Sequence, residues 1–338
     1  MSASVAPCLR STTDEEESNA WYVAGGLRVH CARLPPVYIR AMLTLLMTLV
    51  TLAADSAPNP ARSPEDSLRS RIEARIAQLP GAHVGVVLHD LRNRFHLGIA
   101  EDSSFHAAST MKVPVMIELF RQVDAGHLTL DQSLLVVNSF GSIVDGSNYA
   151  LDPADDSDSS LYAMVGQRVA VRDLVERMIT RSSNLATNTL IPVAGAANAD
   201  ATAHSLGATR MHVRRGVEDG KAFALGLNNT TTASDLAALM LAIERGTAAS
   251  TASCAMMRDI LLREIYSGEI PAGVPAGTPV AQKTGSITGV LHDAAIVYPP
   301  GRTPYVLVVL TSGIPDERVA GLLIADISRL VWAYAAAR

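Results

Sequence analysis

Sequence patterns typical of β-strands lie near both ends of the folded part of this chain, and a long stretch of helical character separates them. Since a sheet must bury its apolar residues against another layer, the two groups of strands are expected to join into one sheet. The sequence therefore predicts an α+β fold with a helical lobe inserted between the two halves of a sheet. The predicted strands span residues 82–91, 94–99, 279–283, 292–298 and 304–311.

The helical lobe is predicted to run from Ser109 to about Arg258. Helical periodicity of apolar residues is clearest over 171–180, 184–193 and 232–245. Two further helices, over 66–79 and 315–337, are predicted outside the lobe. The acidic run at 152–158 lacks the glycine and the closing glutamate of a calcium loop, which favours a solvated surface loop.

An apolar run at residues 41–54 follows Arg40 and ends in small residues. It is shorter than the ~20 residues that a membrane span needs, but it has the length of a signal-peptide core. We therefore expect residues 1–57 to be an N-terminal extension with a signal peptide around 37–57, and 58–338 to form one catalytic domain. A short buried helix is the alternative for the apolar run. Export predicts a periplasmic or secreted protein without a stable membrane anchor after processing.

Composition excludes several classes of function. The net charge is −5, aromatic residues make up 4% of the chain, and no run rich in Lys or Arg occurs, so we expect no nucleic-acid partner. Of three cysteines, Cys8 and Cys31 lie in the predicted extension, which leaves Cys254 alone in the domain. Neither a cysteine cluster nor an HExxH motif is present, and we expect no metal or other cofactor. We also expect a monomer.

The first chemical motif is Ser109-x-x-Lys112. At helical spacing, residues three apart share a face, which places the Lys112 amine beside the Ser109 hydroxyl. A serine needs a neighbouring base to become a nucleophile, and a lysine with a depressed pKa can serve. Only three of the 28 basic residues are lysines, and two of them, Lys112 and Lys283, lie in the motifs described here. This usage indicates chemistry that needs an amine able to lose its proton.

The second motif, Ser182-Ser183-Asn184, lies at a junction between two predicted helices. The Ser182 hydroxyl can relay a proton to a departing nitrogen, and the Asn184 amide can hold a substrate carbonyl. Taken alone, the same residues are more typical of a helix N-cap.

The third motif, Lys283-Thr284-Gly285-Ser286, lies at the end of a predicted strand. Lys283 and Thr284 are candidates to bind a substrate carboxylate, and Gly285 allows a substrate to lie close to the strand edge. The backbone N–H near Ser286 is a candidate second donor of an oxyanion pocket, with that of Ser109 as the first. A strand end running into a glycine turn is the alternative.

The three motifs in this order, SxxK, SxN and KTG, resemble class A β-lactamases and penicillin-binding proteins, from roughly Ser67 to Ala336. FHAASTMKVP resembles the family's nucleophile segment, and LNNTTTASDLAALM is similar to the stretch that closes its Ω-loop. The resemblance implies a three-layer αβα fold, with a five-stranded antiparallel sheet flanked by helices and a mostly helical lobe. It also implies that Ser109 attacks a β-lactam carbonyl to form an acyl-enzyme, with a small-molecule β-lactam as the substrate.

Two positions depart from the family's pattern. Class A members use an Ω-loop glutamate to activate the deacylating water, followed by Leu-Asn three and four residues on, and this setting is absent here. Glu218 is the best candidate base, with Asp219 as an alternative, unless both are surface carboxylates beside Lys221. Downstream, His292 stands near the position where many members have a substrate-binding arginine, and a hydrogen bond to Asp293 is the alternative role for it.

Three functions are compatible with these motifs. A β-lactamase is the first choice. A D,D-peptidase or esterase of the penicillin-binding type would use Ser109 and Lys112 without an effective deacylation base. A penicillin-binding sensor module is disfavoured, because such sensors need a membrane span and the apolar run at 41–54 is too short.

Overall fold

The computed structural model describes residues 21–24, 27–30 and 63–337. The chain divides into two compact units, Met1–Ala61 and Arg62–Arg338. In the first unit, strands β1 (Trp21–Ala24) and β2 (Leu27–His30) form an antiparallel hairpin. The predicted signal-peptide core at 41–54 lies outside the described residues.

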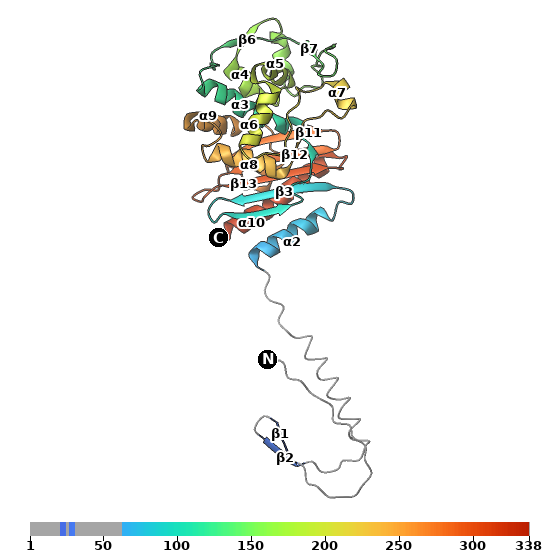
Figure 1. Ribbon diagram of the computed structural model, residues 1–338, viewed down its shortest axis with the longest axis vertical. Helices are drawn as coiled ribbons and strands as arrows, with labels where there is room; N and C mark the ends of the chain where they lie inside the picture. The colour runs from blue at the N-terminus through green and yellow to red at the C-terminus, as the bar shows by residue number, and fades with distance from the viewer. Residues whose placement is uncertain (1–20, 25–26, 31–62, 338) are drawn as a thin grey trace. The chain divides into compact units, whose positions relative to one another are not determined.

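The second unit contains the predicted five-stranded sheet, in which every neighbouring pair is antiparallel. Its strand order confirms that the sheet is assembled from both ends of the domain, because the C-terminal strands 280–312 join the strands 83–90 and 95–99 in one sheet (Figure 1). From one edge to the other, the strands are β11 (Val280–Ile287), β12 (Val290–Val297), β13 (Tyr305–Ser312), β3 (His83–Asp90) and β4 (Phe95–Ile99).

Strand β11 extends further than the sequence predicts. Its pairing with β12 continues through Ile287, so Lys283 to Ser286 lie within the strand and not at its end. The predicted strand, which ended at Lys283, was therefore four residues too short, and one strand residue, Ile287, follows Ser286. Because β11 is an edge strand, one side of its backbone remains free to face the helical lobe.

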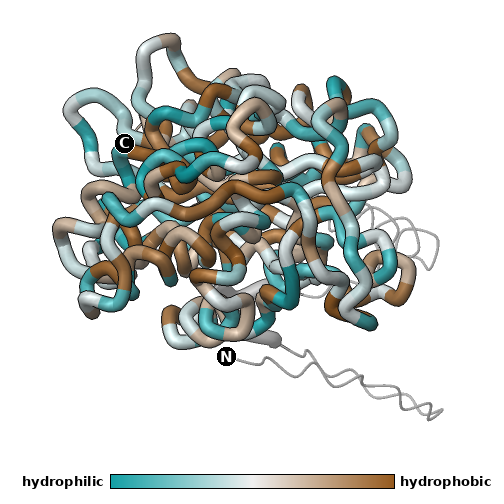
Figure 2. Tube along the Cα trace, turned by 90° about the horizontal axis from the view of Figure 1, so that it is seen from above, coloured by the Kyte–Doolittle hydropathy of each residue, from teal (hydrophilic) through white to brown (hydrophobic). Residues whose placement is uncertain are grey.

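Both faces of the sheet are covered by helices. Helices α2 (Pro64–Ile76) and α10 (Glu317–Ala336) pack on one face, and α8 (Ala233–Glu244) with the helical lobe covers the other (Figure 1). Side chains alternate accordingly along the central strand: Leu307 joins the core under α10, while Leu310 joins the core of the lobe. Hydrophobic segments run through the middle of the molecule in Figure 2.

The lobe between the two halves of the sheet contains the predicted helices together with short strand pairs. Its helices are α3 (Lys112–Asp124), α4 (Val171–Thr180), α5 (Asn184–Ala194), α6 (Ala196–Ser205), α7 (Gly220–Ala224) and α9 (Thr251–Leu261). Its strand pairs are β5 (Phe105–His106) with β10 (Thr230–Thr231), β6 (Ser133–Leu135) with β9 (Arg168–Ala170), and β7 (Phe140–Gly141) with β8 (Asn148–Tyr149).

Within the described residues, α10 is the one helix whose length and composition would suit a membrane span. Half of its most apolar window is buried inside the protein. The buried side chains, among them Leu323 and Ile327, pack on the sheet, so the apolar character of α10 is accounted for by its role as a core helix.

Shortening a buried side chain on either face of β13 should destabilise the domain. Leu307 and Leu310 are both fully buried, on opposite faces of the sheet. We expect Leu307→Ala and Leu310→Ala each to lower the free energy of unfolding by about 2–5 kcal/mol, measured by urea denaturation. Leu322→Ala, at a position on α10 that is 51% exposed, is the matched control and should change it by less than about 0.5 kcal/mol. A near-neutral Leu307→Ala would contradict the two-sided core.

Candidate active site

Ser109 lies in a short 3₁₀ helix, η1 (Ala108–Met111), immediately before α3 begins at Lys112. Ala108 has φ of 46°, a conformation that non-glycine residues adopt at a cost of about 1–3 kcal/mol and that is concentrated at functional sites. The structure thus presents the candidate nucleophile on a tight, strained turn. Its side chain lines a cleft of about 590 Å³ between η1, β11 and the loop that carries Glu218.

Gly285 lets β11 approach this turn. A Cβ atom at this position would lie 3.0 Å from the backbone nitrogens of both Ser109 and Thr110. The glycine is therefore needed for contact between the strand and the nucleophile segment. The sequence predicted only that Gly285 makes room for a substrate, and not this packing role.

Lys112 is fully buried at the start of α3. Its Nζ donates to the Ser182 carbonyl oxygen at 2.6 Å and to Asn184 Oδ1 at 2.9 Å, and it lies 3.2 Å from Ser182 Oγ. Burial away from water, reinforced by the positive charge of Lys283, holds the pKa of Lys112 well below its ordinary value; the carboxylates of Asp156, Glu218 and Glu264 oppose this shift. A buried lysine with a depressed pKa can accept a proton from a serine hydroxyl.

The SxN motif caps a helix and also contacts Lys112. Ser183 caps α5, because its side chain accepts from the Ala186 N–H, while its neighbours turn toward Lys112. Ser182 is buried and has φ of 55°, a second strained residue at the site. The structure therefore brings the two candidate functional residues of this motif into direct contact with the candidate base.

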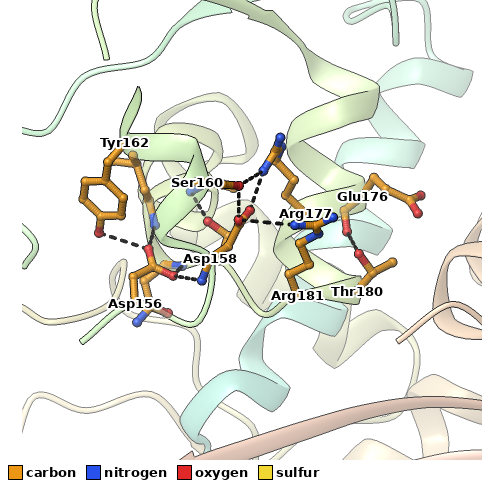
Figure 3. A network of polar contacts seen from close by, with 12 residues as sticks. Asp156, Asp158, Ser160, Tyr162, Glu176, Arg177, Thr180 and Arg181 are labelled. Atoms are coloured by element: carbon orange, nitrogen blue, oxygen red, sulfur yellow. Dashed lines mark hydrogen bonds and ion pairs between the residues drawn. The ribbon is translucent and has the colours of Figure 1, made fainter. Parts of the chain in front are cut away.

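Buried carboxylates anchor the segment that carries this motif (Figure 3). Asp156 accepts hydrogen bonds from the backbone N–H groups of Asn184 (3.1 Å) and Leu185 (2.9 Å) and from the Tyr162 hydroxyl (3.0 Å). A carboxylate at the start of α5 also matches the partial positive charge of a helix N-terminus. Asp156 thus fixes the position of Asn184.

Asp158 holds the preceding helix. Its carboxylate accepts from Arg177 on α4 at 2.7 Å and from the Ser160 hydroxyl at 2.5 Å. Burial alone would raise the pKa of Asp158, but these hydrogen bonds lower it below its ordinary value. Both Asp156 and Asp158 are less than 10% exposed, so the interpretation of residues 152–158 as a solvated loop was wrong for these two.

Glu218 lines the same cleft as Ser109 and belongs to residues 214–229, called the Glu218 loop here. Its carboxylate accepts from Asn184 Nδ2 at 2.5 Å, which links it to the residue that contacts Lys112. Burial raises the pKa of Glu218; the Asn184 hydrogen bond opposes this shift, and the charge of Asp156 adds to it. A carboxylate with a raised pKa, close to a lysine, suits a general base.

The Glu218 loop is held by two asparagines. Asn188 on α5 accepts from the Val217 N–H at 2.7 Å and donates to the Val217 carbonyl at 3.0 Å. Asn229 accepts from the Arg214 N–H at 2.8 Å, and its amide donates to the Arg215 carbonyl at 3.0 Å. These contacts satisfy backbone groups in the segment just before Glu218, whose φ of 60° is the third strained conformation at the site.

Asp219, the alternative base, has a structural role. It caps α7 through the Ala222 N–H and accepts from the Ser142 hydroxyl and the Ile143 N–H, both at 2.9 Å. Burial alone would raise the pKa of Asp219, but these hydrogen bonds lower it below its ordinary value. Since both oxygens are committed to the fold, the structure does not support Asp219 as a base. Lys221 pairs with Asp145 and not with either carboxylate.

The free edge of β11 supplies a backbone donor beside Ser109. The Thr284 N–H points away from β12, because it donates to Glu264. In a strand, alternate residues direct their backbone groups to the same side, so the Ser286 N–H also points to the free edge. Ser286 lines the cleft together with Ser109. This arrangement is compatible with the oxyanion pocket expected from the sequence.

Lys283 and Thr284 are occupied by a carboxylate of the protein itself. Glu264 lies 2.5 Å from Lys283 Nζ and accepts from the Thr284 hydroxyl at 2.8 Å, and both charged side chains are fully buried. Neither Lys283 nor Thr284 lines the cleft. Glu264 is thus the partner of both side chains in this structure, and their direct binding of a substrate carboxylate stays a prediction. Sequence reasoning gave no role to Glu264.

His292 is a structural residue as well. It is fully buried between the sheet and the nucleophile segment. Its Nε2 lies 2.9 Å from the His106 carbonyl oxygen, and its Nδ1 lies 2.9 Å from the Leu291 carbonyl oxygen and 3.2 Å from the Thr311 backbone nitrogen. Burial lowers the pKa of His292 to about 4, so the ring is neutral at pH 7. The expected contact of His292 with substrate was wrong, and so was the alternative hydrogen bond to Asp293.

Comparison with known proteins agrees with this geometry. The sequence pattern of the "Beta-lactamase enzyme family" matches residues 67–335. The chain belongs to this family. A β-lactamase of Citrobacter koseri is 26% identical over 276 residues, covering 80% of this chain and 89% of the relative. One of Amycolatopsis lactamdurans is 28% identical over 279 residues, covering 81% and 87%.

Solved structures share the fold of this family member. A β-lactamase from Sphaerobacter thermophilus DSM 20745 is 28% identical with a TM-score of 0.70, covering 80% of this chain and 97% of the other. PBP-A is also 28% identical, with a TM-score of 0.68 and coverage of 79% and 95%. A mutant of PBP-A has been solved as an acyl-enzyme complex with penicillin G. The α+β fold class is thereby confirmed.

Loss of the Glu264 charge should destabilise the β-lactamase-family domain strongly. Glu264→Gln leaves Lys283 as a buried charge without its counter-ion, which should lower the free energy of unfolding by about 3–5 kcal/mol. Glu176→Gln breaks an exposed ion pair with Arg263 and should cost at most about 1 kcal/mol. Urea denaturation of both variants at pH 7 checks this. Equal effects would show that the buried pair contributes no more than a surface one.

Proposed function

We propose that this chain hydrolyses β-lactam antibiotics of the penicillin and cephalosporin type through an acyl-enzyme on Ser109. The observation that carries the proposal is that Ser109 shares one cleft with Glu218, whose carboxylate is hydrogen-bonded to Asn184, and that Asn184 in turn contacts the buried amine of Lys112. Such a site holds a base for each half of the reaction.

In the first half, neutral Lys112 accepts the proton of the Ser109 hydroxyl, and Ser109 Oγ attacks the lactam carbonyl carbon. The backbone N–H groups of Ser109 and Ser286 stabilise the negative charge that develops on the carbonyl oxygen. The carbon–nitrogen bond of the ring then breaks. The departing nitrogen takes a proton from the Ser182 hydroxyl, which recovers one from Lys112, the amine at 3.2 Å.

In the second half, Glu218 removes a proton from a water molecule, whose oxygen attacks the ester carbonyl carbon. The bond between this carbon and Ser109 Oγ breaks, the proton that Glu218 took from water passes to Ser109 Oγ, and the opened β-lactam leaves as a carboxylic acid. Asn184 orients Glu218 through its amide and contacts Lys112 through its carbonyl oxygen, so it couples the two bases.

A substrate carboxylate is proposed to lie near the cleft residues Ser286 and Thr288, both of which have hydroxyl donors. Glu264 neutralises the charge of Lys283, so Lys283 would act on the substrate only over a longer distance. The protein is further proposed to act as an exported monomer whose catalytic domain is 58–338.

A D,D-peptidase or esterase is the second candidate. The similarity to PBP-A favours it, and so does the absence of the usual Ω-loop sequence around Glu218. The two functions differ in the fate of the acyl-enzyme: a β-lactamase hydrolyses it rapidly, whereas a penicillin-binding enzyme stays acylated.

Ser109→Ala should abolish covalent labelling by penicillin. The purified protein is mixed with a chromogenic cephalosporin, and absorbance and intact mass are recorded at short times. We expect sustained turnover by the unaltered protein, and neither turnover nor a mass addition with Ser109→Ala, because the only nucleophile proposed is removed. Labelling that persists at another residue would overturn the assignment, and one stoichiometric addition without turnover would favour the second candidate.

Glu218→Gln should trap the acyl-enzyme. Acylation should proceed, while kcat should fall about 10²–10⁴-fold because the water loses its base. Because a base must be ionised, the acid limb of the kcat profile should lie above the usual pKa range of glutamate, in line with the raised pKa of Glu218. Asp155→Asn, at an exposed carboxylate that lines the same cleft, is the matched control and should keep rapid turnover. Unchanged turnover in Glu218→Gln would place the base elsewhere.

A further inference from the structure

Away from the cleft, three side chains with metal-binding atoms converge at the base of the Glu218 loop. Asp200 and His204 lie one turn apart on α6, and His212 lies on the segment that leads into the loop. One ligand atom of each lies within 4.8 Å of the other two, and all three side chains are half-buried. No short sequence motif marks this group, because its members come from two different segments, and the expectation of no metal did not consider it.

A hydrogen bond fixes the protonation of His204. Its Nε2 lies 2.8 Å from the Met211 carbonyl oxygen, which can only accept, so Nε2 carries the hydrogen. In the neutral ring, Nδ1 is then an unprotonated acceptor, and it faces Asp200 Oδ2 at 3.8 Å. Two acceptors that face each other need a proton or a cation between them.

The spacing of the three groups suits a metal ion. His212 Nδ1 lies 3.7 Å from Asp200 Oδ1, and this distance and the 3.8 Å to His204 exceed the roughly 2.9 Å of a direct hydrogen bond. Zinc bonds of about 2.0–2.1 Å in tetrahedral geometry place neighbouring ligand atoms about 3.3 Å apart. These two distances involve different oxygens of Asp200, and one ligand atom of each residue lies within 4.8 Å of the others, so the ligand atoms would have to approach one another by up to about 1.5 Å to complete the site.

The surroundings of the group also resemble those of a metal site. Metal-binding histidines commonly donate their second ring nitrogen to a backbone carbonyl, as His204 does to Met211. The Val213 N–H donates to Asp200 Oδ1 at 2.7 Å and thereby orients the carboxylate. Two imidazoles and one carboxylate form a donor set typical of zinc.

We propose that Asp200, His204 and His212 bind one divalent transition-metal ion of the zinc type, with the fourth position open to water. His212 pairs with Thr230 through two backbone hydrogen bonds, of 2.9 and 3.0 Å, which close the base of the Glu218 loop. A bound ion would link α6 to this pair of residues at the base of the Glu218 loop and would thereby stabilise the loop. The site stands independently of the β-lactam chemistry, which uses none of its residues.

The test is a titration of the chelator-treated, purified protein with zinc chloride by isothermal titration calorimetry. We expect one ion per chain, and an increase of the melting temperature by about 5 °C at a free zinc concentration near 100 times Kd. Cobalt(II) should give the visible absorption of a four-coordinate nitrogen–oxygen site. His212→Gln should weaken zinc binding at least about tenfold, because one of three protein ligands is lost.

His96→Gln is the matched control. His96 belongs to the other close histidine pair, with its Nδ1 3.3 Å from His89 Nε2, and its loss should leave zinc binding unchanged. His204→Gln is a second test variant, and the circular dichroism of every variant verifies folding. The proposal would be overturned by the absence of one-to-one binding, by full affinity in a folded His212→Gln or His204→Gln protein, or by loss of binding in His96→Gln.

Discussion

The site depends on the burial of two lysines between the sheet and the helical lobe. Lys112 and Lys283 are both fully buried, and the positive charge of Lys283 lowers the pKa of Lys112. Removing an ammonium group from water costs several kcal/mol, and the fold offsets this in two different ways. Lys283 has a buried counter-ion, Glu264, at 2.5 Å, whereas Lys112 has only neutral acceptors in direct contact.

This difference separates the roles of the two amines. A lysine paired with a carboxylate keeps its proton, while a lysine surrounded by amide and hydroxyl oxygens loses it more readily. The carboxylates that act on Lys112, from Asp156 and Glu218, are not among its hydrogen-bond partners. The architecture therefore directs the depressed pKa to the amine nearest in sequence to the nucleophile, and it pairs the second lysine with a buried carboxylate.

Sequence reasoning located the sheet, the main helices and the residues that surround Lys112, because each of these has a local signal. Helix α4 occupies 171–180 as predicted, and the hairpin of β3 and β4 follows its apolar pattern. Periodicity cannot show how far a strand continues once its residues become polar or small. The predicted strand therefore ended before Thr284 and Gly285, whereas β11 includes both. The contact between Gly285 and Ser109 joins segments far apart in the sequence and has no local signature.

The missed carboxylates have a common physical reason. Asp156 lies in an acidic run that looks solvated, and Glu264 follows an arginine at the end of α9, so both have the appearance of surface residues. One signal was available for Asp156: the backbone N–H groups of Asn184 and Leu185 at the start of α5 need acceptors, and the capping side chain of Ser183 accepts from a different one, that of Ala186. A buried backbone donor must find a partner, and the nearest acidic loop supplies it. Accounting for such donors identifies structural carboxylates that composition and motif spacing alone assign to the surface.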